Sequence, residues 1–308
     1  MKNNLIFSII IPTYNQSQFL EKAIKSVLLQ KKNYEIIIID NFSTDNTEQV
    51  VQKYKNKNLK YVKINNFGII GKSRNLGIKN SNAPWIAFLD SDDLWHKNKL
   101  EIIEKFIKNN LDFDVITNDE EIFYEESKKK TQWKYGPYTN NFYKKLILDG
   151  SCISTSATIV KKEFLLKKNI LFSEKKEFAS VEDYDFFLNL AFHDAKFKFI
   201  HQILGTHLYH KNSFSRDFQK HHNSLEAVLY YHVNNKQKFE KNKKLLMKKI
   251  NTNIAIIKAY DEIKFNKNYL KACKLIFKNL MINPIYLIKY LFKEIYKKIK
   301  VWENLKGV

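Results

Sequence analysis

The sequence predicts an α/β protein with a doubly wound, mostly parallel sheet of Rossmann type and a helical, basic C-terminal extension. Two observations support this prediction. Over the first 110 residues, short apolar runs rich in β-branched residues alternate with segments of helical periodicity. From residue 216 onward the pattern is mostly helical and lysine is abundant. A chain of 308 residues, 44% of them hydrophobic, can bury the core of one such domain and carry a further module.

Four apolar runs are predicted to form strands. They are Phe7–Ile11, Glu35–Ile39, Leu59–Ile64 and Trp85–Leu89. Their apolar character is continuous rather than alternating, which is typical of strands that are covered by helices on both faces. Strands of this kind occur in parallel sheets, so a parallel arrangement is expected here.

The segments around these strands carry apolar residues at helical spacing. The first segment has Leu20, Ala23, Ile24, Val27 and Leu28 after a candidate cap at Ser17; the second has Val50, Val51 and Tyr54 after candidate caps at Ser43, Thr44 and Asp45; the third has Leu100, Ile103 and Phe106. Residues three and four apart share one face of a helix, so each segment has an apolar face for the sheet.

Polar and aromatic residues follow each predicted strand. They are Pro12, Thr13, Tyr14 and Asn15 after the first, Asp40–Thr44 after the second, Asn65–Gly68 after the third and Asp90–Asp93 after the fourth. The carboxyl ends of parallel strands meet at one edge of a sheet, so these groups are expected to converge there as a nucleotide site requires. Simpler interpretations exist, because Asp40 could cap the following turn and Tyr14 could lie at a rim.

Asp90, Asp92 and Asp93 are three like charges within four residues at a buried strand end. They repel one another unless a cation lies among them. Mg²⁺ or Mn²⁺ bound by one or two carboxylates keeps positions open for phosphate oxygens, and the sequence has no Walker-type phosphate loop. The alternative is that the cluster caps the helix that contains Leu100. Arg74 could direct its guanidinium to the nucleotide or form a surface salt bridge.

At this point the sequence resembles the GT-A glycosyltransferases called family 2, of the bacterial inverting type. The matching segments are Ser8–Asn15, Ile36–Thr47, Arg74–Gly77 and Phe88–Asp93, in the family's order and spacing, and the match extends over residues 5 to about 215. The resemblance implies that the donor is a nucleotide diphosphate sugar with uridine as the preferred base. One departure is Asn41, where the family commonly has a second Asp.

The resemblance also implies roles for individual residues. The base would be contacted by Pro12, Thr13, Tyr14, Asn15 and Asp40, and Arg74 would lie near the nucleotide. Asp90 would approach the ribose, and Asp93 would belong to the same nucleotide-binding cluster. Asp92 would reach the metal. In the second half, Glu182, Asp183 and Asp185 precede an apolar helical face, and Asp183 matches the family's general base. His210, and less well His207, match a His that contacts metal or diphosphate; an Arg common nearby in the family is absent, and a structural role is the alternative.

The predicted domains are a catalytic domain over 1–215, with a nucleotide-sugar half (about 1–110) and an acceptor half (about 111–215), and a helical basic region over 216–308. In this last region an apolar stripe of Ile288, Phe292, Ile295, Ile299 and Trp302 lies among lysines. The stripe could rest on anionic lipid or pack on the catalytic domain. Without a predicted signal peptide or membrane-spanning run, the chain is expected in the cytoplasm, peripheral to the inner face of the cytoplasmic membrane where the stripe binds lipid.

These observations predict a metal-dependent inverting glycosyltransferase. It would transfer a sugar, with Mn²⁺ or Mg²⁺ as cofactor, to a hydroxyl of a glycan or lipid-linked acceptor in cell-surface polysaccharide or lipopolysaccharide synthesis. The formal charge of +21 indicates an acidic partner or reflects a biased base composition of the genome. A nucleic-acid-binding protein is the first alternative, but no nucleic acid is expected because the usual binding motifs are absent. A nucleotidyltransferase is the second.

Overall fold

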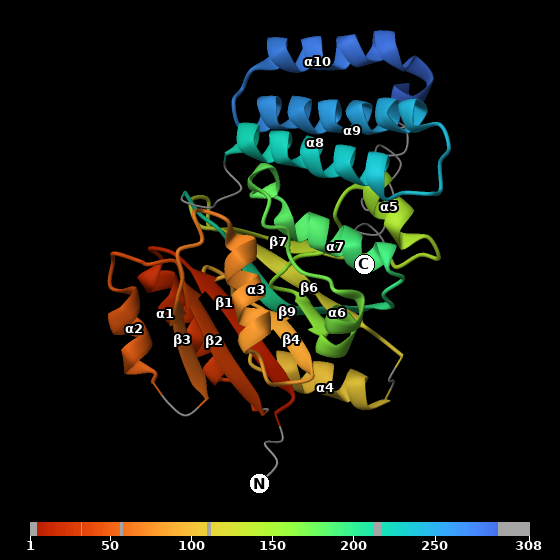
Figure 1. The fold of residues 1–308 in the computed structure, drawn as a ribbon. Helices are drawn as coiled ribbons and strands as arrows, with labels where there is room; N and C mark the ends of the chain where they lie inside the picture. Colours follow the sequence, from red (N-terminus) through yellow and green to blue (C-terminus); the bar gives the residue numbers. More distant parts are fainter. Residues whose placement is uncertain (1–4, 32, 56–57, 110–111, 212–216, 289–308) are drawn as a thin grey trace, which may run out of the picture. The chain divides into compact units, whose positions relative to one another are not determined.

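The computed structural model describes residues 5–31, 33–55, 58–109, 112–211 and 217–288 (Figure 1). The chain divides into two compact units. Unit 1 comprises Met1–Leu146 and Gly150–Arg216, and unit 2 comprises Ile147–Asp149 and Asp217–Val308.

Unit 1 begins with four parallel strands in the order β3-β2-β1-β4. They are β1 (Phe7–Thr13), β2 (Tyr34–Asp40), β3 (Leu59–Lys63) and β4 (Trp85–Phe88). Each coincides with a predicted apolar run, and the predicted parallel pairing is confirmed. The order is the one that β-α alternation produces in one half of a Rossmann-type sheet.

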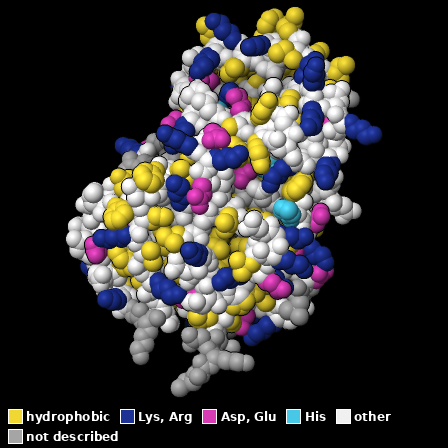
Figure 2. All heavy atoms as spheres, in the orientation of Figure 1, with side chains coloured by type: hydrophobic (Ala, Val, Ile, Leu, Met, Phe, Trp, Pro, Cys, Tyr) yellow, Lys and Arg dark blue, Asp and Glu magenta, His cyan; other side chains and the backbone are white. Residues whose placement is uncertain are grey.

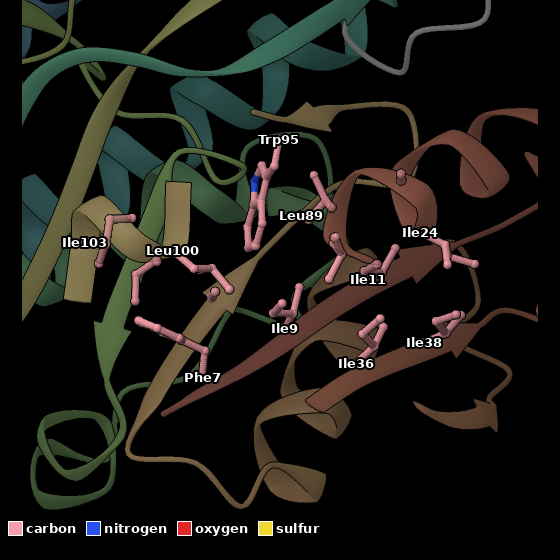
Figure 3. Packing of buried hydrophobic residues seen from close by; sticks show 14 of the residues in the cluster. Phe7, Ile9, Ile11, Ile24, Ile36, Ile38, Leu89, Trp95, Leu100 and Ile103 are labelled. Carbon is pink, nitrogen blue, oxygen red and sulfur yellow. The ribbon is translucent and has the colours of Figure 1, made fainter. Parts of the chain in front are cut away.

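Helices cover both faces of these strands. The helices are α1 (Ser17–Leu28), α2 (Thr47–Lys53), α3 (Ile70–Asn80) and α4 (Lys99–Asn109). Ile9 and Ile11 belong to a core cluster that includes residues of α1, α2 and α4, shown at close range in Figure 3. Ile10 points the opposite way along the strand and faces Gly77 of α3. The continuous apolar run of β1 is therefore explained by burial on both sides.

Gly77 allows α3 to approach β1 closely. A Cβ atom built on Gly77 would lie 2.4 Å from Cγ2 of Ile10. We expect Gly77→Ala to lower the free energy of unfolding by about 1–3 kcal/mol, because overpacking outweighs a gain of roughly 0.5–1 kcal/mol in helix propensity. Chemical denaturation measures this difference, with Lys79→Ala on the exposed side of the same helix as the control. Equal stability of Gly77→Ala and the parent protein would contradict the expectation.

The first two helices are held at their starts by one side chain. Asp45 accepts hydrogen bonds from the backbone N–H groups of Ser17 (2.9 Å) and Thr47 (3.0 Å). Ser17 lies inside α1, so the predicted cap at Ser17 is wrong. The physical reason is that a carboxylate 28 residues away in sequence satisfies the helix start, a contact that local spacing cannot reveal.

The second half of unit 1 extends the same sheet with mixed pairing. Beyond β4 the order continues β8-β6-β9-β5, and β7 pairs with β6. The strands are β5 (Leu94–Trp95), β6 (Val115–Tyr124), β7 (Lys129–Trp133), β8 (Thr158–Lys161) and β9 (Phe197–Tyr209). The helices are α5 (Phe142–Asp149), whose last three residues are counted in unit 2, α6 (Lys162–Lys168) and α7 (Glu182–Phe192), with a 3₁₀ turn at Lys176–Phe178. The pair β6–β9 is parallel, whereas β4–β8, β6–β8, β6–β7 and β5–β9 are antiparallel.

The described part of unit 2 includes the helices α8 (Phe218–Asn235), α9 (Lys243–Lys264) and α10 (Tyr269–Ile282), which lie side by side (Figure 1). Each is preceded by an Asp or Asn whose side chain caps the first turn, namely Asp217, Asn242 and Asn268. Of the predicted apolar stripe only Ile288 is described; the other members lie outside the described residues. Over the described ranges, we find no helix whose length and apolar character would allow it to cross a bilayer.

Candidate active site

Three exposed aromatic rings stand at the carboxyl ends of the parallel strands. Tyr14, Phe42 and Phe67 follow β1, β2 and β3 and are all more than half exposed. Asn15, Phe42 and Phe67 adopt positive φ angles of 50°, 51° and 55°. Residues other than glycine avoid this region, and such strain is concentrated at functional sites. The backbone at this edge therefore holds flat rings open to a ligand.

The loops that carry these rings are fastened to one another by hydrogen bonds. Asn15 donates its backbone N–H to Ser43 Oγ (2.9 Å), and its side-chain Oδ1 accepts the N–H of Thr44 (2.8 Å). Asn41 Oδ1 accepts the N–H of Asn66 at 2.8 Å. The residue that departs from the family pattern thus joins the β2 and β3 loops.

Asp40 is buried at the base of this edge. Its carboxylate accepts hydrogen bonds from the N–H of Ser43 (3.0 Å) and from the hydroxyl of Tyr61 (2.6 Å). Burial, with this hydrogen bond, raises the pKa of Tyr61, so the phenol stays a donor. The hydrogen bond from Ser43 shows that Asp40 does cap the turn that follows β2, as one of the two interpretations predicted. Among the other predicted residues, Pro12 and Thr13 are buried, and Thr13 Oγ1 has no hydrogen-bond partner in the described structure.

Arg74 joins two acidic motifs that are far apart in sequence. This residue lies on α3 and is 3% exposed. Its guanidinium donates from Nη1 to Glu182 Oε1 (2.6 Å) and from Nη2 to Asp90 Oδ1 (2.8 Å). The guanidinium also lies over the ring of Phe172, 5.2 Å from its centroid. The alternative of a surface salt bridge is wrong, because the guanidinium and its ion pair with Glu182 are buried, although the side chain of Asp90 is 30% exposed. Arg74 instead links the end of β4 to the start of α7.

Glu182 is a buried carboxyl group beside this arginine. Burial raises its pKa to about 7, because removal of the carboxylate from water outweighs the attraction of Arg74, and the charge of Asp183 acts in the same direction as burial. The folded protein therefore binds the Glu182 proton more tightly than the unfolded chain does. This contribution to stability is complete below the ordinary pKa near 4.5 and is lost as the pH rises through about 7.

This sign gives a prediction for Glu182→Gln, which removes the titration and keeps an oxygen that can accept from Arg74. Between pH 5 and pH 8 the thermal midpoint of the parent protein should fall relative to that of the variant. Thermal unfolding in matched buffers measures the difference, with Glu163→Gln at an exposed position as the control. A difference that is constant over this pH range would mean that Glu182 is already ionised at pH 5.

The three carboxylates after β4 have separate partners. Asp90 pairs with Arg74, and Asp92 pairs with His210. Asp93 is buried and pairs with His207. The helix α4 begins only at Lys99, so the alternative that this cluster caps the helix is wrong. The repulsion expected from the sequence is therefore relieved in part by the guanidinium of Arg74 beside Asp90.

Asp93 connects its loop to β9 and to the loop before β8. It accepts the backbone N–H of Leu208 (3.0 Å) and the hydroxyl of Ser156 (2.5 Å), and it pairs with His207 Nδ1 at 3.0 Å. The Asp93 carboxylate raises the pKa of His207 to about 10 and keeps the imidazole positively charged. Asp93 is thus enclosed in protein contacts, whereas the side chain of His207 is 36% exposed.

Asp92 and His210 form the pair best placed for a cation. Asp92 Oδ2 lies 3.0 Å from His210 Nε2, and the buried imidazole stacks on Phe19 at 4.4 Å. Neighbouring ligands of an octahedral ion at about 2.1 Å lie roughly 3 Å apart, so this pair fits Mn²⁺ or Mg²⁺. Within the described ranges no group of three or more His, Cys, Asp or Glu side chains forms a metal site. An ion bound here would therefore need further oxygen ligands from substrate phosphates and water.

Asp183 is the accessible carboxylate at the start of α7. Glu182 and Asp185 are buried, whereas Asp183 is partly exposed, and Thr155 Oγ1 lies 3.5 Å from its Oδ2. The predicted acidic opening of a helix is confirmed, since all three residues lie in the first turn of α7. Arg74 brings this helix start next to the Asp90–Asp93 segment, so the two predicted acidic motifs share one site.

Ser156 and Lys99 are parts of this site that the sequence did not reveal. The Ser156 hydroxyl accepts the N–H of Asp90 (3.1 Å), and its carbonyl accepts from Lys99 Nζ (2.7 Å). Burial lowers the pKa of Lys99 to about 7. A single Ser in a Ser-Thr-Ser run and a Lys at a helix start are ordinary in sequence, so only the tertiary contacts identify them.

A doubly wound sheet with an acid-rich edge at the carboxyl ends of its parallel strands is typical of sugar-transferring enzymes of GT-A architecture. The sequence profile described as "Glycosyl transferase family 2" matches residues 8–167. The chain therefore belongs to this family, and the predicted family, enzyme class and fold are confirmed. Its relatives include an uncharacterised glycosyltransferase of Rickettsia conorii, 48% identical over 110 residues, which make up 35% of this chain and 18% of that protein.

Another relative is the poly(ribitol-phosphate) β-N-acetylglucosaminyltransferase TarS of Staphylococcus aureus. It is 39% identical over 106 residues, 33% of this chain and 18% of TarS, so the match covers less than a fifth of either relative. The crystal structure of TarS 1–349 with UDP-GlcNAc is similar in fold, with a TM-score of 0.65 and 21% identity over 87% of this chain and 79% of that one. A mannosyltransferase of Pyrobaculum calidifontis with GDP-Man and Mn²⁺ has a TM-score of 0.59 and 13% identity over 98% and 84%.

Proposed function

We propose that the protein transfers a sugar from a UDP-sugar to a hydroxyl group of a glycan or lipid-linked acceptor, with inversion at the anomeric carbon. The observation that carries this proposal is the Arg74 bridge. Arg74 binds Asp90 and Glu182, which are two residues from Asp92 and adjacent to Asp183. A candidate base for the acceptor and a candidate cation site for the leaving diphosphate therefore meet at one edge.

Asp183 is proposed to remove the proton of the attacking hydroxyl. It is the one acidic residue of the first turn of α7 that solvent reaches, so an acceptor oxygen can approach it. A base in this position makes the oxygen nucleophilic as it attacks the anomeric carbon from the side opposite to the nucleotide. A single displacement of this kind inverts the configuration of the sugar.

Asp92 and His210 are proposed to hold Mn²⁺ or Mg²⁺ beside the diphosphate. When bound, the ion would neutralise the charge that develops on the departing nucleotide. The chain's own contribution is to fix the positions of these two ligands. Asp93, the residue after Asp92, accepts the backbone N–H of Leu208, which lies two residues before His210. The presence of Mn²⁺ in the Pyrobaculum structure supports a divalent cation as cofactor.

The donor is proposed to be a uridine nucleotide that binds over the β1, β2 and β3 loops. The rings of Tyr14, Phe42 and Phe67 give stacking surfaces for a base, and the buried hydroxyl of Thr13 has no partner in the described structure. Binding of UDP-GlcNAc by TarS supports uridine. The acceptor is proposed to belong to cell-surface polysaccharide or lipopolysaccharide synthesis, since TarS acts on poly(ribitol phosphate).

The test is a panel of UDP-, GDP- and CDP-sugars, each measured by thermal shift with Mn²⁺ and by nucleotide release with candidate acceptors. We expect UDP-sugars alone to raise the thermal midpoint, and release of UDP to depend on an acceptor. Stabilisation by GDP-sugars instead would replace the uridine assignment and leave the sugar-transfer chemistry standing. Release of pyrophosphate from a nucleoside triphosphate and a sugar phosphate would identify a nucleotidyltransferase and overturn the proposal.

A further inference from the structure

The helix α10 of unit 2 has an exposed apolar face. Leu270, Phe277 and Met281 are 68%, 65% and 74% exposed and are spaced by seven and four residues. Residues at this spacing lie along one side of a helix. The opposite side packs within unit 2, where Ala272 and Asn279 are buried. The helix is therefore apolar on a side that the described chain leaves uncovered.

Lysines accompany this face. Lys274 lies four residues after Leu270 and three before Phe277, in the same row, and Lys278 lies at its side. Neither lysine forms an ion pair with any residue of the described ranges, whereas Lys271 pairs with Glu262 at 2.5 Å. The helix α10 itself contains no Asp or Glu. Figure 2 shows apolar and basic side chains interspersed over the region where Figure 1 places α10.

The charge of the chain is concentrated in the same part of the sequence. Residues 217–308 contain 20 lysines and seven acidic residues, and thus account for 13 of the 21 net positive charges. A second copy of the chain would bring another lysine-rich face of the same charge against this one, which disfavours self-association through this face. A partner with an apolar interior and a negatively charged surface would match both the apolar side chains and the lysines of α10. The aliphatic stems of lysines can lie along apolar groups while their ammonium groups reach anions.

We propose that α10 is a docking face for an anionic lipid bilayer. Leu270, Phe277 and Met281 would enter the boundary between headgroups and acyl chains, and Lys274 and Lys278 would contact the lipid phosphates. This face is distinct from the predicted stripe at Ile288–Trp302 and does not depend on the sugar-transfer proposal. Docking through this face would attach unit 2 to the surface of a membrane.

The test is sedimentation of the full chain with vesicles of phosphatidylglycerol and phosphatidylcholine, compared with phosphatidylcholine alone. The parent protein should bind the anionic vesicles and lose most binding at high salt. Phe277→Ser with Met281→Ser should weaken binding about tenfold or more. Lys274→Gln with Lys278→Gln should weaken it by about fivefold for each lysine and remove the preference for anionic lipid.

The matched control is Leu166→Ser, which removes an equally exposed leucine from unit 1 and should leave vesicle binding unchanged. Circular dichroism and the thermal midpoint show whether each variant keeps its fold. Parent-like vesicle binding by the folded Phe277→Ser/Met281→Ser variant would overturn the proposal. So would a parent protein that ignores vesicles and dissociates from a dimer to a monomer when these residues are replaced, because that result would assign the face to a second copy.

Discussion

Asp92→Ala should abolish detectable sugar transfer while the protein stays folded. Asp92 carries one of the two side chains proposed to hold the cation, and the remaining His210 offers a single protein ligand. The side chain of Asp92 is 19% exposed and does not contribute to the apolar core, so its removal should change the thermal midpoint little. Product formation from a UDP-sugar and an acceptor measures transfer, and Mn²⁺ titration in the presence of UDP measures loss of the cation site.

Two further measurements separate a metal role from a purely structural one. Glu163→Ala removes an exposed carboxylate on α6 and should transfer at the parent rate. Treatment of the parent protein with a chelator should stop transfer, and added Mn²⁺ should restore it in the parent but not in Asp92→Ala. Normal turnover by chelator-treated protein would show that no metal takes part.

The parallel half of the fold could be predicted from the sequence because its signals are local. The run Phe7–Ile11 has to be buried on both faces, and the structure places Ile9 and Ile11 in one layer and Ile10 against Gly77. The mixed half was not predicted strand by strand. β6 contains a buried polar run, Thr117–Glu120, that no hydrophobic pattern distinguishes from a loop.

The site divides in the same way. Motif spacing identified the segments around Asp92, Asp183 and His210, which the structure brings to one sheet edge. It could not tell that Arg74 is buried between Asp90 and Glu182, because these partners are 16 and 108 residues away along the chain. Motif spacing also could not assign different roles to the adjacent residues Asp92 and Asp93. Only the contacts with Ser156 and Leu208 show that the side chain of Asp93 faces inward.

Asp183→Asn should lower the rate of transfer by roughly two to four orders of magnitude, the usual contribution of a general base. In the parent protein the backbone N–H of Tyr184 donates to Asp183 Oδ1 at 2.7 Å. The amide of Asn has the size of the carboxylate and its oxygen can still accept this hydrogen bond, so the start of α7 should stay intact. What it cannot do is accept the proton of the attacking hydroxyl. Single-turnover kinetics with saturating donor and acceptor measure this loss directly.

Donor affinity is the second readout, because it separates chemistry from binding. The residues proposed to bind the nucleotide lie on the β1 to β4 loops, so UDP should bind Asp183→Asn as tightly as it binds the parent protein. Asp185→Asn is the matched control: this carboxylate is buried and accepts from Asn189 at 3.0 Å, and its replacement should leave most of the rate intact. Near-normal turnover by Asp183→Asn would move the base to Glu182 or Asp185. Loss of UDP binding in the same variant would instead place Asp183 in the donor site, because a base that acts only on the acceptor makes no contact with the nucleotide.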